Sequence, residues 1–373
     1  MLKVFHTGDN HLGMTFSGRN YSKDLRNQLR QARFDNLQKL VTIANEEKCH
    51  LFIIAGDLFH RPNVSNKRVI ETVRILSEFN GCVVVLPGNH DYFHSESNLW
   101  NTFMEHTPEH VLVLKDLEPY SLEEFGLNIV LYPAPCNDKW SCENKIGWIE
   151  EHTRSNDLWH LGIAHGSVKG ISPDFDERYF PMSEEEIRKT KLDHIFLGHT
   201  HLPYPEKSIV DLSSVGFSYA GTSEPDGFDC NHPGYARLTT FNEDRITSQC
   251  IETGEFRFKE LDLEIDKVEE IEEINLNNIT DSPSEKLLLK INITGAISRE
   301  EYRELTASIE NLRTKALHLD VNLDNLQFEV TKESIADEFS EGSFPYMLLN
   351  RLAEKDDRTA LQLADELIGR VRE

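Results

Sequence analysis

The sequence predicts an α/β protein in which helices cover the outside of a sheet or a pair of sheets. Over about the first 200 residues, short apolar runs rich in β-branched residues alternate with polar stretches whose apolar residues recur at helical spacing. Each apolar run is closed by glycine, proline or a polar turn residue. This alternation is typical of the α/β class, because each helix buries its apolar face against a sheet.

Six strands and two long helices are predicted in this region. The strands are LKVFHT (2–7), LFIIAG (51–56), CVVVLPG (82–88), LNIVLYPA (127–134), HLGIAHG (160–166) and HIFLGHT (194–200). Residues 22–47 and 66–79 carry apolar side chains at helical spacing. From about residue 208 to 258 the pattern changes to strands without long helices, through SYAGTSE, YARLTTFN, ITSQCIET and FRFKELDLEID. These strands are expected to complete a β-rich core.

The C-terminal third of the chain predicts a separate, smaller module. Residues 267–285 are rich in acidic side chains and are interpreted as a short helix followed by a linker. The runs KLLLKINITG (286–295), SREEYRELTASIENLRTKALHL (298–319) and NLQFEVTK (325–332) predict strand, helix and strand, and residues 345–373 predict an amphipathic helix or helix pair. The expected domains are residues 1–260, 261–335 and 336–373.

Composition limits the partners and the compartment. The formal charge of −25 argues against tight non-specific DNA binding by this chain alone, since such binding needs Lys and Arg against phosphates, and it favours a basic partner. No apolar run approaches the roughly 18 residues of a membrane span, and the start MLKVFHTGDNHLG lacks a signal-peptide core. The six cysteines form no CxxC pair. We therefore expect a cytoplasmic protein with free thiols and no contact with a membrane.

Polar residues follow the predicted strands in five clusters. They are Asp9-x-His11, Gly56-Asp57, Gly88-Asn89-His90-Asp91, His165-Gly166 and Gly198-His199-Thr200-His201. Carboxylate, imidazole and amide oxygen together suit a divalent first-row metal such as Mn²⁺, Fe²⁺ or Zn²⁺. A lone histidine is more often a core or surface residue, but five clusters in order, each at a strand end, favour metal binding.

The clusters predict two neighbouring metal ions. Asp9 and His11 are two residues apart on an extended segment and can bind one ion, with His201 returning to it. Asp57 is the expected bridge, because a carboxylate has two oxygens that can face two cations. Asn89, His165 and His199 then complete a second site. Paired metals are a recurring arrangement for the cleavage of phosphate esters.

The order of these blocks resembles the calcineurin-like metallophosphoesterase superfamily. GDLFHRPNVS, GNHD, AHGSVKG and GHTHLP resemble its SbcD branch, the DNA double-strand-break repair nucleases, over about residues 1–260. The resemblance implies a four-layer β-sandwich flanked by helices and two divalent ions, with Mn²⁺ expected. It implies one ion on Asp9, His11, Asp57 and His201, and the other on Asp57, Asn89, His165 and His199.

The same resemblance implies catalytic roles for neighbouring residues. His90 is expected beside the scissile phosphate, where an imidazolium can donate a proton to the leaving 3′ oxygen. His60 is expected to help place DNA for exonucleolytic cutting. Asp91 has two interpretations: it orients His90, as carboxylates behind catalytic groups do, or it is a turn or cap residue.

For the tail, the resemblance implies a small α/β capping domain that contacts DNA, and final helices that dock on a coiled-coil ATPase of the SbcC type. The expected docking residues are Met347, Leu348, Leu349, Leu352, Leu361, Leu363, Leu367 and Ile368. Packing of these residues onto the chain's own body is the alternative.

A homodimer is also expected from the resemblance, through residues 64–79 and 97–106. The exposed apolar patch such an interface needs would consist of Leu99, Trp100, Phe103 and Met104. Ordinary core packing would produce the same apolar pattern, so it is the alternative.

Three functions are therefore compared. The first is a Mn²⁺-dependent DNA exonuclease and endonuclease of break repair, acting with an SbcC-type ATPase. The second is a phosphodiesterase or phosphatase that acts alone on a small substrate, which the acidic charge favours. The third is a non-catalytic scaffold, which the complete ligand set argues against. The acidic segment YAGTSEPDGFDCNHPG (219–234) departs from the family pattern and bears on how DNA would lie.

Overall fold

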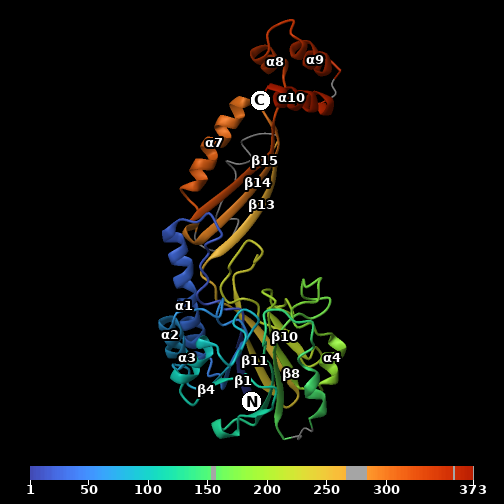
Figure 1. Ribbon diagram of the computed structural model, residues 1–373. Coiled ribbons are helices and arrows are strands. Elements are labelled where there is room, and N and C mark those ends of the chain that lie inside the picture. The colour runs from blue at the N-terminus through green and yellow to red at the C-terminus, as the bar shows by residue number, and fades with distance from the viewer. Residues whose placement is uncertain (153–156, 266–283, 356–357, 373) are drawn as a thin grey trace. The chain divides into compact units, whose positions relative to one another are not determined.

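The computed structural model describes residues 1–152, 157–265, 284–355 and 358–372. The chain divides into two compact units, Met1–Arg257 and Phe258–Glu373 (Figure 1). The predicted acidic helix and linker at 267–285 fall almost entirely outside the described residues, which resume with a short 3-10 helix at Ser284–Lys286.

Two β-sheets form the centre of the first unit. Their strands are β1 (Leu2–Thr7), β2 (Leu51–Ala55), β3 (Cys82–Leu86), β4 (Val111–Val113), β5 (Tyr120–Ser121), β6 (Ile129–Ala134), β7 (Trp159–His165), β8 (His194–Gly198), β9 (Ile209–Asp211), β10 (Phe217–Tyr219), β11 (Tyr235–Asn242) and β12 (Arg245–Glu252). The seven-stranded sheet has the order β4-β3-β2-β1-β11-β12-β9, and the five-stranded sheet has the order β10-β8-β7-β6-β5. Strands β1 to β4 are parallel to one another, and so are β6, β7, β8 and β10.

Alternation along the strands produces the layers. In β2, Leu51 and Ile53 enter the core between the two sheets, whereas Phe52 and Ile54 enter the core under the helices. Successive side chains of a strand point to opposite faces, so an unbroken apolar run is what a strand buried on both faces requires. The outer face of the five-stranded sheet has its own core, which includes Ile195 and Ile187.

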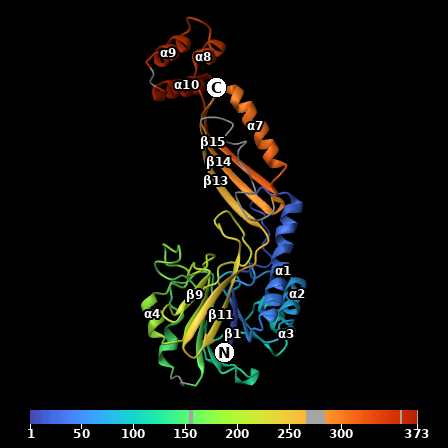
Figure 2. The same ribbon diagram turned by 180° about the vertical axis from the view of Figure 1, so that it is seen from behind.

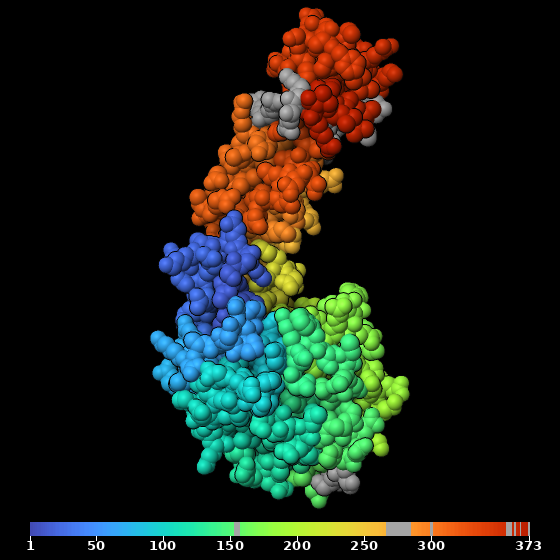
Figure 3. Space-filling view, in the orientation of Figure 1, coloured from blue at the N-terminus to red at the C-terminus, as the bar shows by residue number. Residues whose placement is uncertain are grey.

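Helices cover both outer faces (Figures 1 and 2). The helices α1 (Lys23–Glu46), α2 (Asn66–Leu76) and α3 (Asn98–His106) lie over the larger sheet, and α4 (Glu184–Lys189) lies on the other side of the unit. Ser22 caps α1, because its side chain accepts a hydrogen bond from the Leu25 N–H at 3.1 Å. In Figure 3, residues before about 110 are blue to cyan and the residues that follow them are green. The two groups cover adjoining parts of the visible face of the first unit. The predicted four-layer α/β architecture is confirmed.

The expected apolar patch for a homodimer is not exposed. Leu99, Trp100 and Phe103 are at most 1% exposed and pack in the core under the helices, and Met104 is partly buried against it. The prediction of an exposed patch at these residues was wrong, and core packing explains their pattern. The apolar side of α3 packs against the sheet, so these side chains form part of the core of the same chain.

Among the described residues, the second unit contains a three-stranded sheet with helix α7 packed against it. The elements are β13 (Arg257–Ile265), β14 (Leu287–Ile297), α7 (Arg299–Arg313) and β15 (His318–Phe328), with strand order β13-β14-β15. Ile291, Leu305 and Leu319 are buried in its core. The predicted strand, helix and strand are therefore present. Two details differ. Strand β13 joins this sheet rather than the first β-rich core. Strand β15 begins at His318 instead of 325, because Ala316 and Leu319 continue the helical spacing of the residues before them.

Three helices end the chain. They are α8 (Lys332–Glu338), which was not predicted, α9 (Phe344–Ala353) and α10 (Arg358–Arg372). Of the expected docking residues, Leu349, Leu352, Leu361 and Ile368 pack among these helices. Met347, Leu363 and Leu367 are 58%, 56% and 52% exposed. Packing among the terminal helices thus explains some of the expected docking residues, and Met347, Leu363 and Leu367 stay exposed.

Among the described residues, no helix is both long and apolar enough to cross a membrane.

The burial of Phe103 leads to a stability prediction. Phe103→Ala removes a fully buried ring that contacts the rings of Phe59 and Trp100, so we expect the free energy of unfolding to fall by about 3 to 5 kcal/mol. Denaturant-induced unfolding measures this change. The control Leu117→Ala, at a side chain that is 48% exposed, should change it by less than about 0.5 kcal/mol. A Phe103→Ala protein of unchanged stability that shifts from dimer to monomer would instead support the rejected interface.

Candidate metal centre

The polar clusters gather where parallel strands end. Asp9 and His11 follow β1, Asp57 follows β2, and His165 is the last residue of β7. Because the carboxyl ends of parallel strands meet at one edge of a sheet, residues far apart in sequence come together there. The two sheets meet at this edge, since His165 Nδ1 lies 2.9 Å from the backbone oxygen of Ala55 at the end of β2.

The backbone at this edge is unusual. Asp9, His11, Asp57 and His199 have φ values of 52°, 47°, 51° and 99°, in the region that side chains other than glycine rarely adopt. Such conformations cost free energy and cluster where function fixes a geometry. Four of them among the predicted ligands mark this edge as the functional site.

Close approach of the backbone also requires glycine here. Gly56 has φ 89°, and a Cβ at this position would collide with the ring of His165. A Cβ on Gly88 would collide with the carboxylate and backbone nitrogen of Asp57. Both glycines therefore allow the clusters to approach one another.

The first group of ligand atoms comprises Asp9, His11 and His201. One ligand atom from each lies within 4.8 Å of the others. The Nε2 atoms of His11 and His201 face each other at 3.2 Å. Two nitrogens that bind one ion at about 2.1 Å each are separated by roughly 3 Å when they are adjacent ligands, so this spacing suits a shared ion. Asp57 Oδ2 lies 3.8 Å from His11 Nε2.

The second group comprises Asp57, Asn89, His165 and His199. His165 Nε2 lies 2.9 Å from Asn89 Oδ1 and 3.4 Å from Asp57 Oδ2, and the rings of His165 and His199 are 5.5 Å apart. Asp9 connects the groups, because it also lies within 4.8 Å of Asp57 and His165. Its carboxylate accepts hydrogen bonds from the His199 N–H at 3.0 and 3.1 Å. The structure thus brings all seven predicted ligands to one place.

Burial makes positive charge necessary at this site. Asp9 and Asp57 are 1% and 2% exposed. Burial raises the pKa of both carboxyl groups, but His165 and other histidines outweigh burial at Asp57 and hold its pKa well below the usual range. Burial opposes the charged form of His165, yet the Asp57 carboxylate prevails and raises the His165 pKa to about 9. The Asp57 charge is thus stabilised by the neighbouring imidazole of His165.

These residues fit a pair of divalent cations. A cation beside Asp57 would take over the charge stabilisation that the neighbouring His165 provides, since buried carboxylates are stable only when paired or metal-bound. The Ala55 carbonyl accepts a hydrogen bond from His165 Nδ1, which leaves Nε2 facing Asp57 and Asn89. Such a backbone partner is what orients a metal-binding imidazole.

His90 and His60 lie beside the first group. The His90 ring is 4.8 Å from the His11 ring and 5.3 Å from the His60 ring. His90 Nδ1 lies 3.1 Å from the backbone oxygen of His60. Burial, followed by the nearby charges of His90 and Arg61, lowers the His60 pKa to about 4, so this imidazole is neutral at pH 7. Both rings are partly exposed and can meet a substrate.

Asp91 holds the loops rather than the His90 ring. Its two carboxylate oxygens accept hydrogen bonds from the N–H groups of Phe59 and Gly88, both at 2.8 Å. Of its two interpretations, these contacts match the turn residue. Burial and the Asp57 charge raise the Asp91 pKa to about 7. Asp91 therefore acts on the site by fixing the turn that carries Asn89 and His90.

Contacts behind His201 were not predicted. Asp226 Oδ1 lies 3.6 Å from His201 Nδ1 and Oδ2 lies 3.5 Å from Arg33. Cys230 Sγ lies 3.4 Å from Asp226 and 3.8 Å from His201 Nδ1. Asp226 and Cys230 belong to the acidic segment 219–234, whose departure from the family pattern was the available signal. Asp226 is placed to orient His201, because it faces the ring nitrogen opposite the ligand group.

Comparison with known proteins gives the same assignment for the fold. The model of the family described as calcineurin-like phosphoesterase matches residues 2–203. The chain is similar to the uncharacterized metallophosphoesterase YhaO of Bacillus subtilis, with 26% identity over 231 residues, 60% of this chain and 53% of that protein. It is also similar to the SbcD component of the nuclease SbcCD of Staphylococcus saprophyticus, with 24% identity over 254 residues, 61% of this chain and 64% of that protein. The chain thus spans between half and two thirds of the length of these relatives.

Solved structures similar to the chain include protein TT1561 of Thermus thermophilus, with a TM-score of 0.39, 9% identity, and coverage of 67% of this chain and 98% of that one. A dimetal phosphatase from Danio rerio has a TM-score of 0.39, 12% identity, and coverage of 67% and 95%.

The contact between Asp226 and His201 leads to a prediction about metal affinity. Asp226→Asn keeps the shape but removes the charge that orients His201, so we expect Mn²⁺ affinity to fall by roughly 10- to 100-fold. Isothermal titration calorimetry with Mn²⁺ measures it. Asp57→Ala is the positive control, which should abolish binding of both ions because it removes the bridging carboxylate. Wild-type affinity in Asp226→Asn would contradict an orienting role.

Proposed function

The chain belongs to the calcineurin-like phosphoesterase family, whose members are metal-dependent phosphoesterases with a dimetal centre, and on this premise we propose that it is a Mn²⁺-type DNA nuclease. It would hydrolyse phosphodiester bonds in DNA break repair, as an exonuclease and endonuclease. The observation that carries the proposal is the convergence of the ligand atoms around Asp57, with His11 Nε2 at 3.2 Å from His201 Nε2 and His165 Nε2 at 3.4 Å from Asp57 Oδ2.

The proposed metal ligands divide between two ions. Asp9, His11, Asp57 and His201 would hold one, and Asp57, Asn89, His165 and His199 the other. Two such cations supply Lewis acidity for the phosphate and offset the negative charge that develops in the transition state. Five of these proposed ligands are almost completely buried, namely Asp9, His11, Asp57, Asn89 and His165. Their burial excludes bulk water from their side of the site. His201, at 29% exposure of its side chain, lies at the open side.

His90 is the proposed proton donor. The His60 carbonyl accepts a hydrogen bond from His90 Nδ1, which leaves Nε2 for the substrate. As water attacks phosphorus and the bond from phosphorus to the leaving 3′ oxygen breaks, His90 would donate the Nε2 proton to that oxygen. The neutral imidazole of His60 lies beside it and is proposed to place the nucleic acid.

DNA is the proposed substrate because of three features. The blocks GDLFH and GNHD match the SbcD pattern, and the chain is similar to a protein named as part of the SbcCD nuclease. The second unit, with its three strands and α7, has the layout expected of a capping domain. A phosphatase for small substrates needs no such appendage.

A phosphoesterase for a small substrate is the second candidate. The charge of −25 favours it, because an acidic chain repels a polyanion more strongly than it repels a small ester. The two candidates share the metal centre and His90. They differ in whether a duplex is cleaved.

Hydrolysis of a labelled linear duplex and of bis(4-nitrophenyl) phosphate, with Mn²⁺ present or chelated, tests the proposal. We expect Mn²⁺-dependent shortening of the duplex. His90→Asn should leave Mn²⁺ binding intact and lower turnover by roughly 10² or more, the range that general-acid groups supply. His94→Asn, at an exposed histidine outside the site, is the matched control. Equal turnover in the two variants would refute the role of His90, and cleavage of the small ester alone would favour the second candidate.

The proposed partner is an SbcC-type coiled-coil ATPase that binds the exposed apolar side chains of α9 and α10. Met347, Leu363 and Leu367 remain more than half exposed after the helices pack together. We expect the double variant Leu363→Asp, Leu367→Asp to lose co-purification with the ATPase, because buried charge disrupts an apolar interface. Leu202→Asp, at a 51% exposed side chain of the first unit, should retain it. Retention in both would argue against this surface.

A further inference from the structure

Aromatic and basic side chains border the metal centre on the side of His199. A cavity of about 500 Å³ is lined by Trp140, Pro173, Asp174, Phe175, Asp176, Arg178 and Tyr179. We name the three aromatic residues of this cavity, Trp140, Phe175 and Tyr179, with the cations Lys139 and Arg178, the aromatic platform. The volume lies within the range of about 300 to 1,000 Å³ that small-molecule sites occupy.

The aromatic platform is continuous with the metal centre. The ring of Tyr179 lies 4.7 Å from the ring of His199 at an interplanar angle of 33°. On the next segment, the Asn89 side-chain amide donates a hydrogen bond to the Lys139 backbone oxygen at 3.4 Å. Two proposed ligands of the second ion thus contact the platform directly. A group bound there would lie next to a phosphate held at the metal centre.

Backbone hydrogen bonds fix the two halves of the platform together. The Ser141 N–H donates to the Arg178 carbonyl, and the Phe180 N–H donates to the Ser141 carbonyl, both at 2.8 Å. This pairing sets Trp140 beside Tyr179, although the two lie 39 positions apart in sequence (179 minus 140). The platform is therefore preformed, which lowers the entropy cost of binding.

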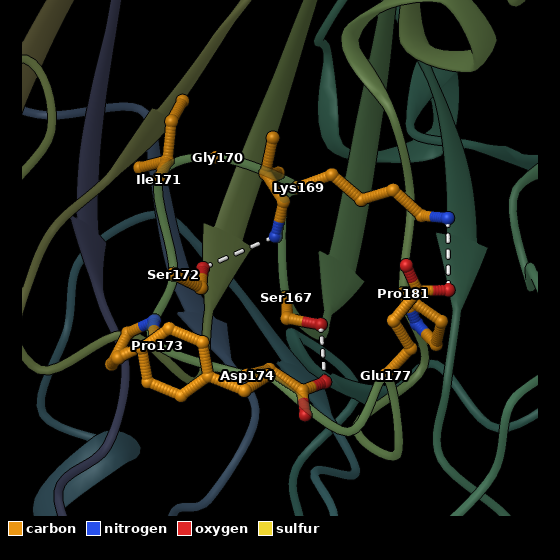
Figure 4. A pocket seen from close by; sticks show the side chains of 11 residues that line it. Ser167, Lys169, Gly170, Ile171, Ser172, Pro173, Asp174, Glu177 and Pro181 are labelled. Atoms are coloured by element: carbon orange, nitrogen blue, oxygen red, sulfur yellow. Dashed lines mark hydrogen bonds and ion pairs between the residues drawn. The ribbon is translucent and has the colours of Figure 1, made fainter.

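Asp174 locks the loop that carries Arg178 and Tyr179. Its carboxylate accepts hydrogen bonds from the N–H groups of these two residues at 3.2 and 3.0 Å and from Ser167 Oγ at 2.8 Å. Figure 4 shows the neighbouring pocket, in which Ser167 and Asp174 point toward each other and Lys169 pairs with Glu177 across the same loop. Hydrogen bonds within the loop therefore stabilise the negative charge of Asp174.

Two rings of the aromatic platform are largely open to solvent. Phe175 is 96% exposed and Trp140 is 55% exposed. The Lys139 ammonium lies 4.6 Å from the centre of the Trp140 ring. Arg178 is exposed and lies 3.6 Å from Asp176, an ion pair open to solvent that contributes little. Flat apolar surfaces beside cations complement a ligand that is both planar and anionic.

Resting on the proposed phosphoesterase function, we propose that the aromatic platform binds the base of the nucleotide whose phosphate lies at the metal centre, by stacking on Trp140 or Tyr179. Stacking recognises any base, since each has a π-face, and so suits an enzyme that cuts without sequence preference. The chain would then select nucleotides over simple phosphodiesters through these rings. Lys139 and Arg178 would attract the adjoining phosphates despite the acidic charge of the whole chain.

Two esters with the same leaving group test this selection. Thymidine 5′-(4-nitrophenyl phosphate) carries a base and methyl 4-nitrophenyl phosphate does not, and both release 4-nitrophenolate. We expect the full chain with Mn²⁺ to prefer the thymidine ester in kcat/KM, and Trp140→Ala to reduce this preference by roughly 5- to 100-fold, mainly through KM. Trp140→Phe should retain most of it, and Leu117→Ala should match wild type. An equal effect of Trp140→Ala on both esters, or no effect on either, would overturn the proposal.

Binding without turnover separates this inference from the function on which it rests. With metal chelated, hexathymidylate should quench the tryptophan fluorescence of the wild type. Trp140→Phe should lose most of this quenching while the other three of the four tryptophans still report folding. No quenching in the wild type, or equal quenching in the variant, would refute the platform. Quenching at Trp140 in a protein that hydrolyses neither ester would support the platform and refute the phosphoesterase function.

Discussion

The burial of two carboxylates, Asp9 and Asp57, at the meeting edge of two sheets is the constraint on which the rest of the site depends. Each is almost inaccessible to solvent, and neither charge is stable there without positive charge beside it. Against the effect of burial, the neighbouring His165 stabilises the Asp57 charge and holds the Asp57 pKa low. Two divalent cations would do so more completely, and they would be held by the same atoms. The left-handed backbone at four ligand positions is the cost of this arrangement.

The residues of the proposed metal centre and those of the aromatic platform lie on different parts of the fold. The predicted ligands and His90 lie at or just after the ends of strands, where sheet register fixes positions. The aromatic platform proposed to select the substrate lies on the loops around them, where binding residues are common on such scaffolds. Trp140 and Tyr179 are placed by loop pairing, and Asp226 lies behind His201 in a segment that departs from the family pattern.

The net charge of the chain and its exposed apolar side chains indicate that it binds other molecules. Under the proposed function, a chain with 64 acidic and 39 basic residues would have to bring DNA to the site by local cations, metal ions or a basic partner. The terminal helices bury one part of their apolar side chains and expose another. An ATPase that covers this surface and supplies basic residues would resolve both features together.

The sequence by itself determined the six main strands, α1, α2, the strand-helix-strand layout of the second unit and the family, because these depend on local periodicity and on short blocks of adjacent residues. It also named the residues that meet at the sheet edge. Tertiary structure alone decided that Leu99, Trp100 and Phe103 are core, that Asp91 binds the backbone of Phe59 and Gly88, and that Trp140 lies beside Tyr179. Each of these depends at least partly on contacts between segments distant in sequence, and local sequence does not specify which distant atoms an apolar or acidic side chain will contact.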